Sequence, residues 1–334
     1  MWRRLVILGV IAATALVVCG SAPARPIAPT APPGEVAIFY YPWYGTPERD
    51  GSWQHWDQRG HSPPAMIASG WYPTRGPYSS SDPAVVRAQM REIASAGVDS
   101  VVVSWWGAES AEELRLALVM RATSEAGLRV AIHVEPYPGR TPAALLAQVQ
   151  RLATLGIEDF YVYDSTASPD ADWAAVNAAR PAGVRLFANT GLPGKATAGG
   201  FSGLYTYDVY IYDGSSFARM CASARARGLA CAPSVGPGYD ASRSTGDPRT
   251  QSRRDGRRYD RMWRGAVRSR ADIVTITSYN EWHEGTQIEP ARGVAGGSYA
   301  SYDGAWGATG RRAEVAYLQR TADWAGRYRA VLTR

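Results

Sequence analysis

A chain of 334 residues with 46% hydrophobic side chains can bury a large core, and it fits one large domain as well as two of medium size. The formal charge of +6 does not indicate a nucleic-acid partner, because the basic residues are almost all arginine and are interleaved with Asp and Glu on predicted helix faces. The 12 Trp and 19 Tyr, against 5 Phe, suit either burial in a large core or stacking on sugar rings.

Residues 1–22 are predicted to be an export signal, because two arginines precede the apolar run LVILGVIAATALVV and small residues follow it. The run is short for a bilayer span, so cleavage is favoured over a retained anchor and no stable span is expected in the mature protein. Cys19 lies where a lipoprotein signal places its acylated cysteine, but Val18 before it is not small, so a lipid anchor is less favoured. Residues 23–34 form a Pro/Ala-rich linker. The mature protein is therefore expected to be secreted or held at the cell surface.

Short β-rich runs then alternate with amphipathic helical stretches eight times along the chain. The predicted strands, in chain order, are 36–44, 100–106, 129–137, 159–165, 184–191, 203–212, 229–236 and 272–282.

The helices between these strands carry start and stop residues. In the first, Asp82 is the predicted cap, Pro83 occupies the first turn and Gly97 ends the helix, while Thr141 caps a later one. Eight β/α pairs indicate a (β/α)8 TIM barrel that forms a single catalytic domain over residues 35–334. The alternative is a doubly wound open sheet, which the absence of a Gly-rich phosphate motif after the first strand disfavours.

A long insertion over residues 45–82 leaves the end of the first strand and is rich in Gly, Pro, Trp and Tyr. In a barrel the loops after the strands build the active site, so this insertion is predicted to line a cleft.

Cys221 and Cys231 remain once the signal is removed. An even pair in an exported protein suggests a disulfide, and two buried thiols are the alternative; the sequence leaves both open.

Polar residues gather where the strands end, and in a barrel all these ends face the same mouth. Glu281 and Glu284 follow the last strand in NEWHEGTQIEP, and an interval of three keeps their Cβ atoms within roughly 5–6 Å. Two carboxyl groups in an aromatic cleft are typical of glycoside hydrolysis, where one protonates the leaving oxygen and the other supports the anomeric carbon. A capping or salt-bridged loop pair is the plainer alternative.

His133 and Glu135 alternate along one strand, so both side chains should point to the same side. Four histidines with nearby carboxylates could serve a metal, but the sequence has no HExxH and no compact ligand cluster. We therefore expect neither a metal nor another cofactor.

The motifs after the strands resemble glycoside hydrolase family 99, the endo-α-1,2-mannosidases and endo-α-1,2-mannanases, over residues 36 to about 330. They are, in order, FYYPWYG, YPTRGPYSSSDP, SWWG, HVEPY, FYVYDS, GLYTYD, PSVGPGY and TSYNEWHEGTQIEPA. The resemblance implies a barrel that cleaves internal α-mannosyl linkages of mannan or high-mannose glycans with retention and without a metal.

The resemblance also implies roles for individual residues. Glu281 matches the base that deprotonates the substrate 2-hydroxyl, which then attacks C1 to give a 1,2-anhydro sugar; Glu284 matches the acid that protonates the leaving group. The positions matched to substrate binding are Tyr41, His55, Trp105 or Trp106, His133, Glu135, Tyr205 or Tyr207, and Tyr239. Asn280 and His283, beside the two glutamates in NEWHEGTQIEP, are also expected at the substrate.

Two other functions stay open at this point, a carbohydrate-binding protein on an inactive barrel and a metal-dependent hydrolase on the same fold. A barrel of this size needs no partner to be stable, so a monomer is expected.

Overall fold

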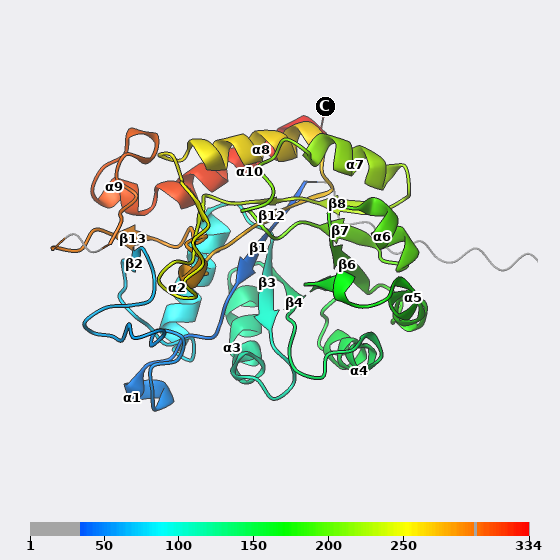
Figure 1. The fold of residues 1–334 in the computed structure, drawn as a ribbon, viewed down its shortest axis with the longest axis horizontal. Helices are drawn as coiled ribbons and strands as arrows, with labels where there is room; N and C mark the ends of the chain where they lie inside the picture. The colour runs from blue at the N-terminus through cyan, green and yellow to red at the C-terminus, as the bar shows by residue number, and fades with distance from the viewer. Residues whose placement is uncertain (1–33, 297–298, 334) are drawn as a thin grey trace, which may run out of the picture.

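The computed structural model describes residues 34–296 and 299–333, and within them a ring of parallel strands is wrapped by helices (Figure 1). The predicted signal, Cys19 and the linker up to residue 33 lie outside the described residues. The strands of the ring are β1 (Glu35–Tyr40), β3 (Ser100–Trp105), β4 (Arg129–Val134), β5 (Asp159–Val162), β6 (Arg185–Asn189), β7 (Gly203–Tyr205), β8 (Ala230–Ala232), β9 (Ser234–Val235) and β12 (Ile273–Ile276).

One strand segment is split into β8 and β9 by Pro233, which has no N–H to donate to a neighbouring strand. β8 pairs with β7, and β9 pairs with β12, which in turn pairs with β1. The ring therefore closes through this segment, and the predicted (β/α)8 barrel is confirmed over the open sheet.

Each strand segment of the ring is followed by a helix that packs against its outer side (Figure 1). These helices are α2 (Pro83–Ser95), α3 (Ala111–Glu125), α4 (Pro142–Ala153), α5 (Asp170–Ala179), α6 (Pro193–Ala198), α7 (Phe217–Arg225), α8 (Arg257–Ser269) and α10 (Ala316–Leu332).

The predicted helix caps are present. The Asp82 side chain accepts a hydrogen bond from the backbone N–H of Ala84, and Thr141 Oγ1 accepts one from Ala144.

Short elements in the loops shape the mouth of the barrel. They are α1 (Pro47–Asp50), β2 (Tyr72–Pro73), η1 (Ser165–Ala167), β10 (Tyr239–Asp240), β11 (Thr250–Gln251), η2 (Trp282–Glu284), β13 (Ala291–Arg292), η3 (Ala305–Gly307) and α9 (Arg311–Glu314).

Several strands end earlier than predicted: the first stops at Tyr40, the sixth at Tyr205 and the last at Ile276. The residues that follow these strands lie outside the paired strands of the sheet and form loops at the mouth of the barrel. Their amino-acid composition is still typical of strands.

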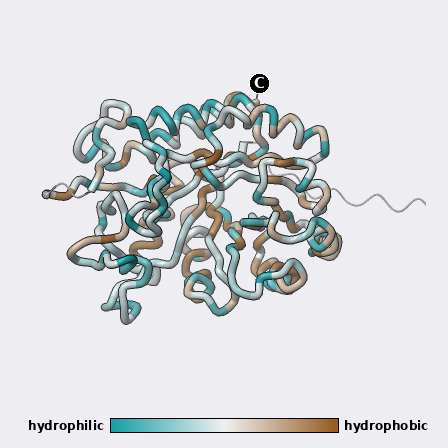
Figure 2. Tube along the Cα trace, viewed as in Figure 1, coloured by the Kyte–Doolittle hydropathy of each residue, from teal (hydrophilic) through white to brown (hydrophobic). Residues whose placement is uncertain are grey.

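Alternation along the strands separates two cores. Inward-facing aromatic residues fill the barrel, where the Tyr161 and Phe187 rings stack at 4.7 Å and Phe39 lies edge-on to Tyr161 at 5.9 Å. Outward-facing residues such as Ile38 and Val103 pack against the helices. Hydrophobic segments accordingly concentrate on the central strands, and hydrophilic ones recur along the outer helices (Figure 2).

The insertion after β1 runs beside the segment after β12. β2 pairs with β13, and the backbone N–H of Thr74 donates to Pro290 O at 2.9 Å. The two segments lie together in Figure 1, the insertion in blue to cyan and the later segment in orange. The loops of the first and last strands therefore form one wall of the mouth.

No helix in residues 34–296 and 299–333 combines the length and apolar character that a bilayer span requires.

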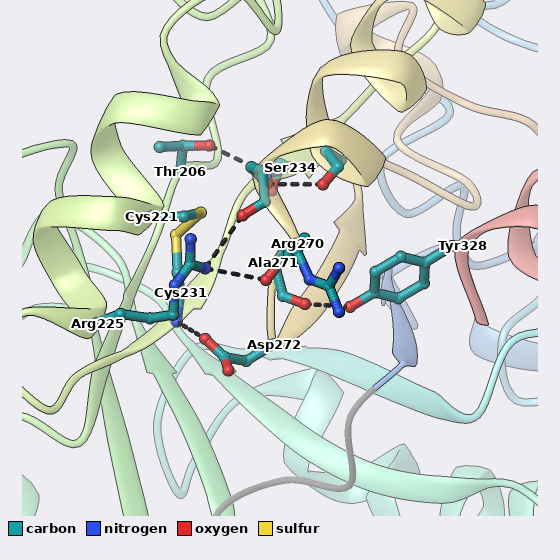
Figure 3. Close-up of a disulfide and its surroundings, with 11 residues drawn as sticks. Thr206, Cys221, Arg225, Cys231, Ser234, Arg270, Ala271, Asp272 and Tyr328 are labelled. Carbon is teal, nitrogen blue, oxygen red and sulfur yellow. Dashed lines mark hydrogen bonds between the residues drawn. A yellow bond between two sulfur atoms is a disulfide. The ribbon is translucent and has the colours of Figure 1, made fainter. Parts of the chain in front are cut away.

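The structure joins Cys221 of α7 to Cys231 of β8, which decides the question that the sequence left open (Figure 3). Their Cα atoms are 5.3 Å apart, and both residues are fully buried. The backbone N–H of Cys231 also donates to Asp272, just before β12, at 2.8 Å. The bond therefore fastens helix α7 to the closing segment of the barrel.

We expect the double variant Cys221→Ala/Cys231→Ala to lose about 2–4 kcal/mol of unfolding free energy, because the cross-link restricts the unfolded chain. Urea denaturation of the oxidised wild type and the variant checks this. Reduced wild type should resemble the variant, and identical midpoints for all three forms would contradict the expected contribution.

Candidate active site

The two predicted catalytic carboxylates lie on one tight turn after β12. Glu281 is the cap of η2 and Glu284 is its last residue, and positions i and i+3 of a 3₁₀ turn lie above one another. Gly285 follows with φ of +64°, and a Cβ there would lie 2.7 Å from the Trp71 ring. Both the conformation and the close contact therefore require glycine at this position.

The field around this turn favours protonated carboxyl groups. Burial raises the pKa of Glu281, which is 3% exposed, well above its usual range, and the charges of Glu284 and Glu135 raise it further. Burial also raises the pKa of the partly exposed Glu284 to about 8, with Asp208 the largest contributing charge. The carboxyl groups of Glu281 and Glu284 therefore do not both ionise readily. One of them can carry a proton near neutral pH while the other acts as a base.

A third carboxylate stands beside this pair. Glu135, just after β4, accepts a hydrogen bond from Ser104 Oγ at 2.8 Å, and His133 Nδ1 lies 2.9 Å from its Oε1. His133 Nε2 is 2.9 Å from the Tyr205 hydroxyl. The predicted common side of His133 and Glu135 is thus confirmed, and the pair lines the inner end of the site.

An aromatic wall made of Tyr41, Trp43 and Trp106 lies near these acidic groups, because burial and the charges of Glu135, Glu281 and Glu284 raise the pKa of Tyr41. Trp43 lies 4.6 Å from the Tyr41 ring, stacks on His55 at 4.2 Å, and is 6.5 Å from Trp106. The Trp43 Nε1 has no acceptor among the described residues, although it is buried. Flat rings with a free donor at their edge suit a sugar face and a sugar hydroxyl.

The predicted tyrosines lie at different depths. Tyr207 bonds to the Tyr41 hydroxyl and stacks on His133 at 5.2 Å, whereas Tyr205 lies deeper and is fully buried. Tyr239 lies near Glu284, since burial and the charge of Glu284 raise its pKa, and its hydroxyl donates to Asp247 at 2.9 Å.

His283, between the two glutamates, is 6% exposed and its ring lies 6.0 Å from His55. Burial and, to a lesser extent, His55 lower the pKa of His283 to about 3, so its ring is neutral at ordinary pH. Its buried Nε2 has no hydrogen-bond partner among the described residues.

Two predicted site residues have their polar groups engaged within the protein. Trp105 points outward and donates to Glu113 of α3 at 2.6 Å, which leaves Trp106 as the tryptophan of this pair at the mouth. Asn280 exchanges hydrogen bonds of 2.8 and 3.0 Å with the backbone of Tyr41. Asn280 therefore ties the catalytic segment to β1, and contact of either residue with substrate stays a prediction.

Several residues that shape this site were not predicted from the sequence. Trp43 and Asp208 lie within the predicted strands 36–44 and 203–212, and Asp247 and Glu289 come after the predicted strands 229–236 and 272–282. Their position in or after these strands was the available signal, but many polar residues share it.

Glu289 accepts hydrogen bonds from several side chains that surround the catalytic segment. It is fully buried and accepts hydrogen bonds from Trp282 Nε1 at 2.8 Å, the Tyr78 hydroxyl at 2.8 Å and Gln89 Nε2 at 2.9 Å. Arg75 Nε lies 3.0 Å away, and burial raises the pKa of Glu289 against the influence of this arginine. Because Trp282 lies between the two candidate catalytic residues, Glu289 fixes the segment that carries them.

Across residues 34–296 and 299–333, no three of His, Cys, Asp and Glu come together as a metal-binding group.

The Glycosyl hydrolase family 99 model matches residues 34–330, which is most of the chain. The chain belongs to glycoside hydrolase family 99. This family 99 protein is 35% identical, over 77% of its length and 71% of the relative, to a glycoprotein endo-alpha-1,2-mannosidase-like protein of Danio rerio. It is 33% identical, over 77% of its length and 70% of the relative, to a glycoprotein endo-alpha-1,2-mannosidase of Xenopus laevis.

The solved family 99 endo-alpha-mannosidase of Bacteroides thetaiotaomicron has a similar structure, with a TM-score of 0.81 and 30% identity over 90% of this chain and 98% of that one. The family 99 chain described here is a glycoside hydrolase.

Proposed function

We propose that this family 99 hydrolase cleaves internal α-1,2-mannosidic linkages of mannan or high-mannose glycans, with retention at the anomeric carbon. The observation that carries the proposal is the placement of Glu281 and Glu284 on one turn, in a field that raises the pKa of both. The aromatic wall of Tyr41, Trp43 and Trp106 near that turn supports a sugar substrate. The names of the relatives support the linkage.

In the first step Glu281 removes the proton of the substrate 2-hydroxyl, and O2 attacks C1 to close a 1,2-anhydro ring. The bond from C1 to the leaving oxygen breaks, and Glu284 donates its proton to that oxygen. On mannose the 2-hydroxyl is axial and lies opposite an α leaving group, so the internal nucleophile is already placed for attack.

In the second step Glu284, now ionised, takes a proton from water, which adds at C1 and opens the anhydro ring. Glu281 returns its proton to O2. Both residues regain their starting protonation states, and two displacements at C1 leave the α configuration unchanged. The steps use no metal or other cofactor.

We propose that the reaction takes place outside the cytoplasmic membrane, because residues 1–22 have the composition of an export signal. The enzyme would then meet polymeric glycans as a secreted or surface-held monomer.

Incubation of the purified protein with α-1,2-linked mannan, with and without a chelator, tests the activity. We expect oligosaccharides in both reactions, and proton NMR of the first products should show the α anomer. Binding without products would indicate a carbohydrate-binding protein, loss of products with chelator would indicate a metal-dependent hydrolase, and an initial β product would exclude the retaining mechanism.

The activity should fall as the pH rises above about 8, because Glu284 must be protonated to act as the acid and its pKa is raised to about 8. Asp208→Asn should move this alkaline limit to lower pH, because removing a nearby negative charge lowers the pKa of Glu284.

The pH dependence of kcat/KM for wild type and Asp208→Asn measures this shift. Asp213→Asn, which removes a carboxylate bonded to Ser215, is the matched control and should leave the limit in place. An unchanged limit in Asp208→Asn would contradict the assigned role of its charge.

A further inference from the structure

A buried arginine contacts the backbone that follows the two candidate catalytic residues. Arg253 is 8% exposed and borders a cavity of about 590 Å³, which is also lined by Trp71, Tyr239 and Tyr302. Burial and the nearby charge of Glu284 raise the pKa of Tyr239, so this tyrosine lies close to the proposed acid and also lines the cavity.

Arg253 holds the backbone of the turn directly. Its Nη2 donates to the carbonyl oxygen of Gly285 at 3.0 Å and to that of Gln287 at 2.8 Å. Gly285 is the residue after Glu284, and a second donor, the Tyr302 hydroxyl, reaches Gln287 O at 3.2 Å. The backbone that follows Glu284, from Gly285 to Gln287, is therefore held by the Arg253 guanidinium and the Tyr302 hydroxyl.

Three aromatic rings enclose the Arg253 guanidinium. Its Cζ lies 4.6 Å from the centre of the Trp71 ring, 4.7 Å from Tyr302 and 4.9 Å from Tyr317. Within the described ranges no carboxylate forms an ion pair with Arg253, and its Nε and Nη1 have no hydrogen-bond acceptor. The buried charge is therefore compensated by the two backbone carbonyls and by cation–π contacts with the three rings.

Burying a cation without a carboxylate partner costs folding free energy. A function for Arg253 in the active site would explain why this cost is tolerated. The Trp71 ring packs both on the guanidinium and on Gly285, where there is no room for a Cβ. The cage of three aromatic rings around Arg253 therefore packs directly against the catalytic turn. A displacement of Arg253 would displace Gly285, the residue that follows Glu284.

We propose that Arg253 is a positioning residue for Glu284: it fixes the carbonyls of the catalytic turn so that the carboxyl group points at the leaving oxygen. This inference rests on the proposed function, in which Glu284 is the acid. A planar guanidinium can bridge two carbonyls while its faces stack on rings, and the ammonium of lysine cannot reproduce that geometry.

The test compares Arg253→Lys and Arg253→Ala with wild type on two substrates, α-1,2-linked mannan and an aryl mannobioside with a nitrophenolate leaving group. Nitrophenolate departs without a proton, so a misplaced acid affects it little. We expect kcat/KM on mannan to fall roughly 100-fold, the loss typical of a 1 Å misplacement, and the value on the aryl substrate to change little.

Two further measurements separate positioning from a loss of folding. Methylguanidinium should restore part of the mannan activity of Arg253→Ala, because the lost side chain borders an existing cavity. Hydrogen exchange should accelerate in residues 278–290 of both variants and not elsewhere. Arg264→Gln, on the exposed face of α8, is the matched control. If Arg253→Ala does not fold, Trp71→Phe opens the cage without removing the charge and should show the same substrate dependence.

Equal losses on the two substrates, or unchanged exchange in residues 278–290, would overturn the role of Arg253. If wild type fails to cleave either mannoside, the proposed function fails, and hydrogen exchange still decides whether Arg253 fixes the turn.

Discussion

Glu281→Gln and Glu284→Gln are each expected to lower kcat/KM on α-1,2-linked mannan by about 100-fold or more, because each removes a group that transfers a proton in the transition state. The two variants should differ on an aryl mannobioside with a nitrophenolate leaving group. Glu284→Gln should keep much of its rate in the first step, since that leaving group needs no acid. Glu281→Gln should lose as much as on mannan, since the 2-hydroxyl still requires a base.

Both variants should remain folded, because glutamine fills the same volume and removes a charge from a site that raises the pKa of both carboxyl groups. Thermal unfolding and circular dichroism check this, with the exposed Glu125→Gln as a control for the purification and the assay. Near-normal turnover of mannan by either site variant would refute the catalytic assignment.

Glu289→Gln is expected to lower the unfolding free energy by about 3 kcal/mol, because it removes one of the two carboxylate oxygens that Arg75 and the buried donors share. It also places an amide N–H₂ among the donors of Trp282, Tyr78 and Gln89, where only an acceptor satisfies them.

Glu92→Gln is the matched comparison, because Glu92 pairs with the same arginine at 2.6 Å but is 30% exposed. Glu92→Gln should lower the unfolding free energy by no more than about 1 kcal/mol. Urea denaturation of the two variants measures the difference, and similar midpoints would show that Glu289 is not the centre of this network. Activity of Glu289→Gln should also fall, since Trp282 lies between the proposed catalytic residues.

Much of the barrel could be predicted from the sequence, because most strands are short apolar runs followed by polar residues and a helix, and α2, α3 and α4 begin at a capping side chain. The strand ends were less predictable: residues such as Tyr207 and Trp282 have strand-like composition but lie in loops. Alternation could have separated Trp105 from Trp106, since Trp105 continues the outward series of Val101 and Val103.

The two proposed catalytic residues were found because they lie within one short motif. The residues that set their environment come from other strands: Asp208 follows β7, and Asp247 lies beyond β10. Their proximity to Glu284 depends on how the loops fold over the mouth, which no local pattern encodes. The same applies to Arg253, whose sequence neighbours are exposed, and to the Cys221–Cys231 bond, which depends on the approach of α7 to β8.

The pairing of β1 with β12 brings together parts of the chain that are more than two hundred residues apart, as in the bonds between Tyr41 and Asn280. The proposed reaction centre rests on that junction, so it exists only when the polypeptide has been synthesised almost to its far end and the ring has been completed. A chain that ends just before β12 would have most of the strands and helices and none of the acid–base pair, and hydrolysis should therefore appear abruptly, as a late event in folding.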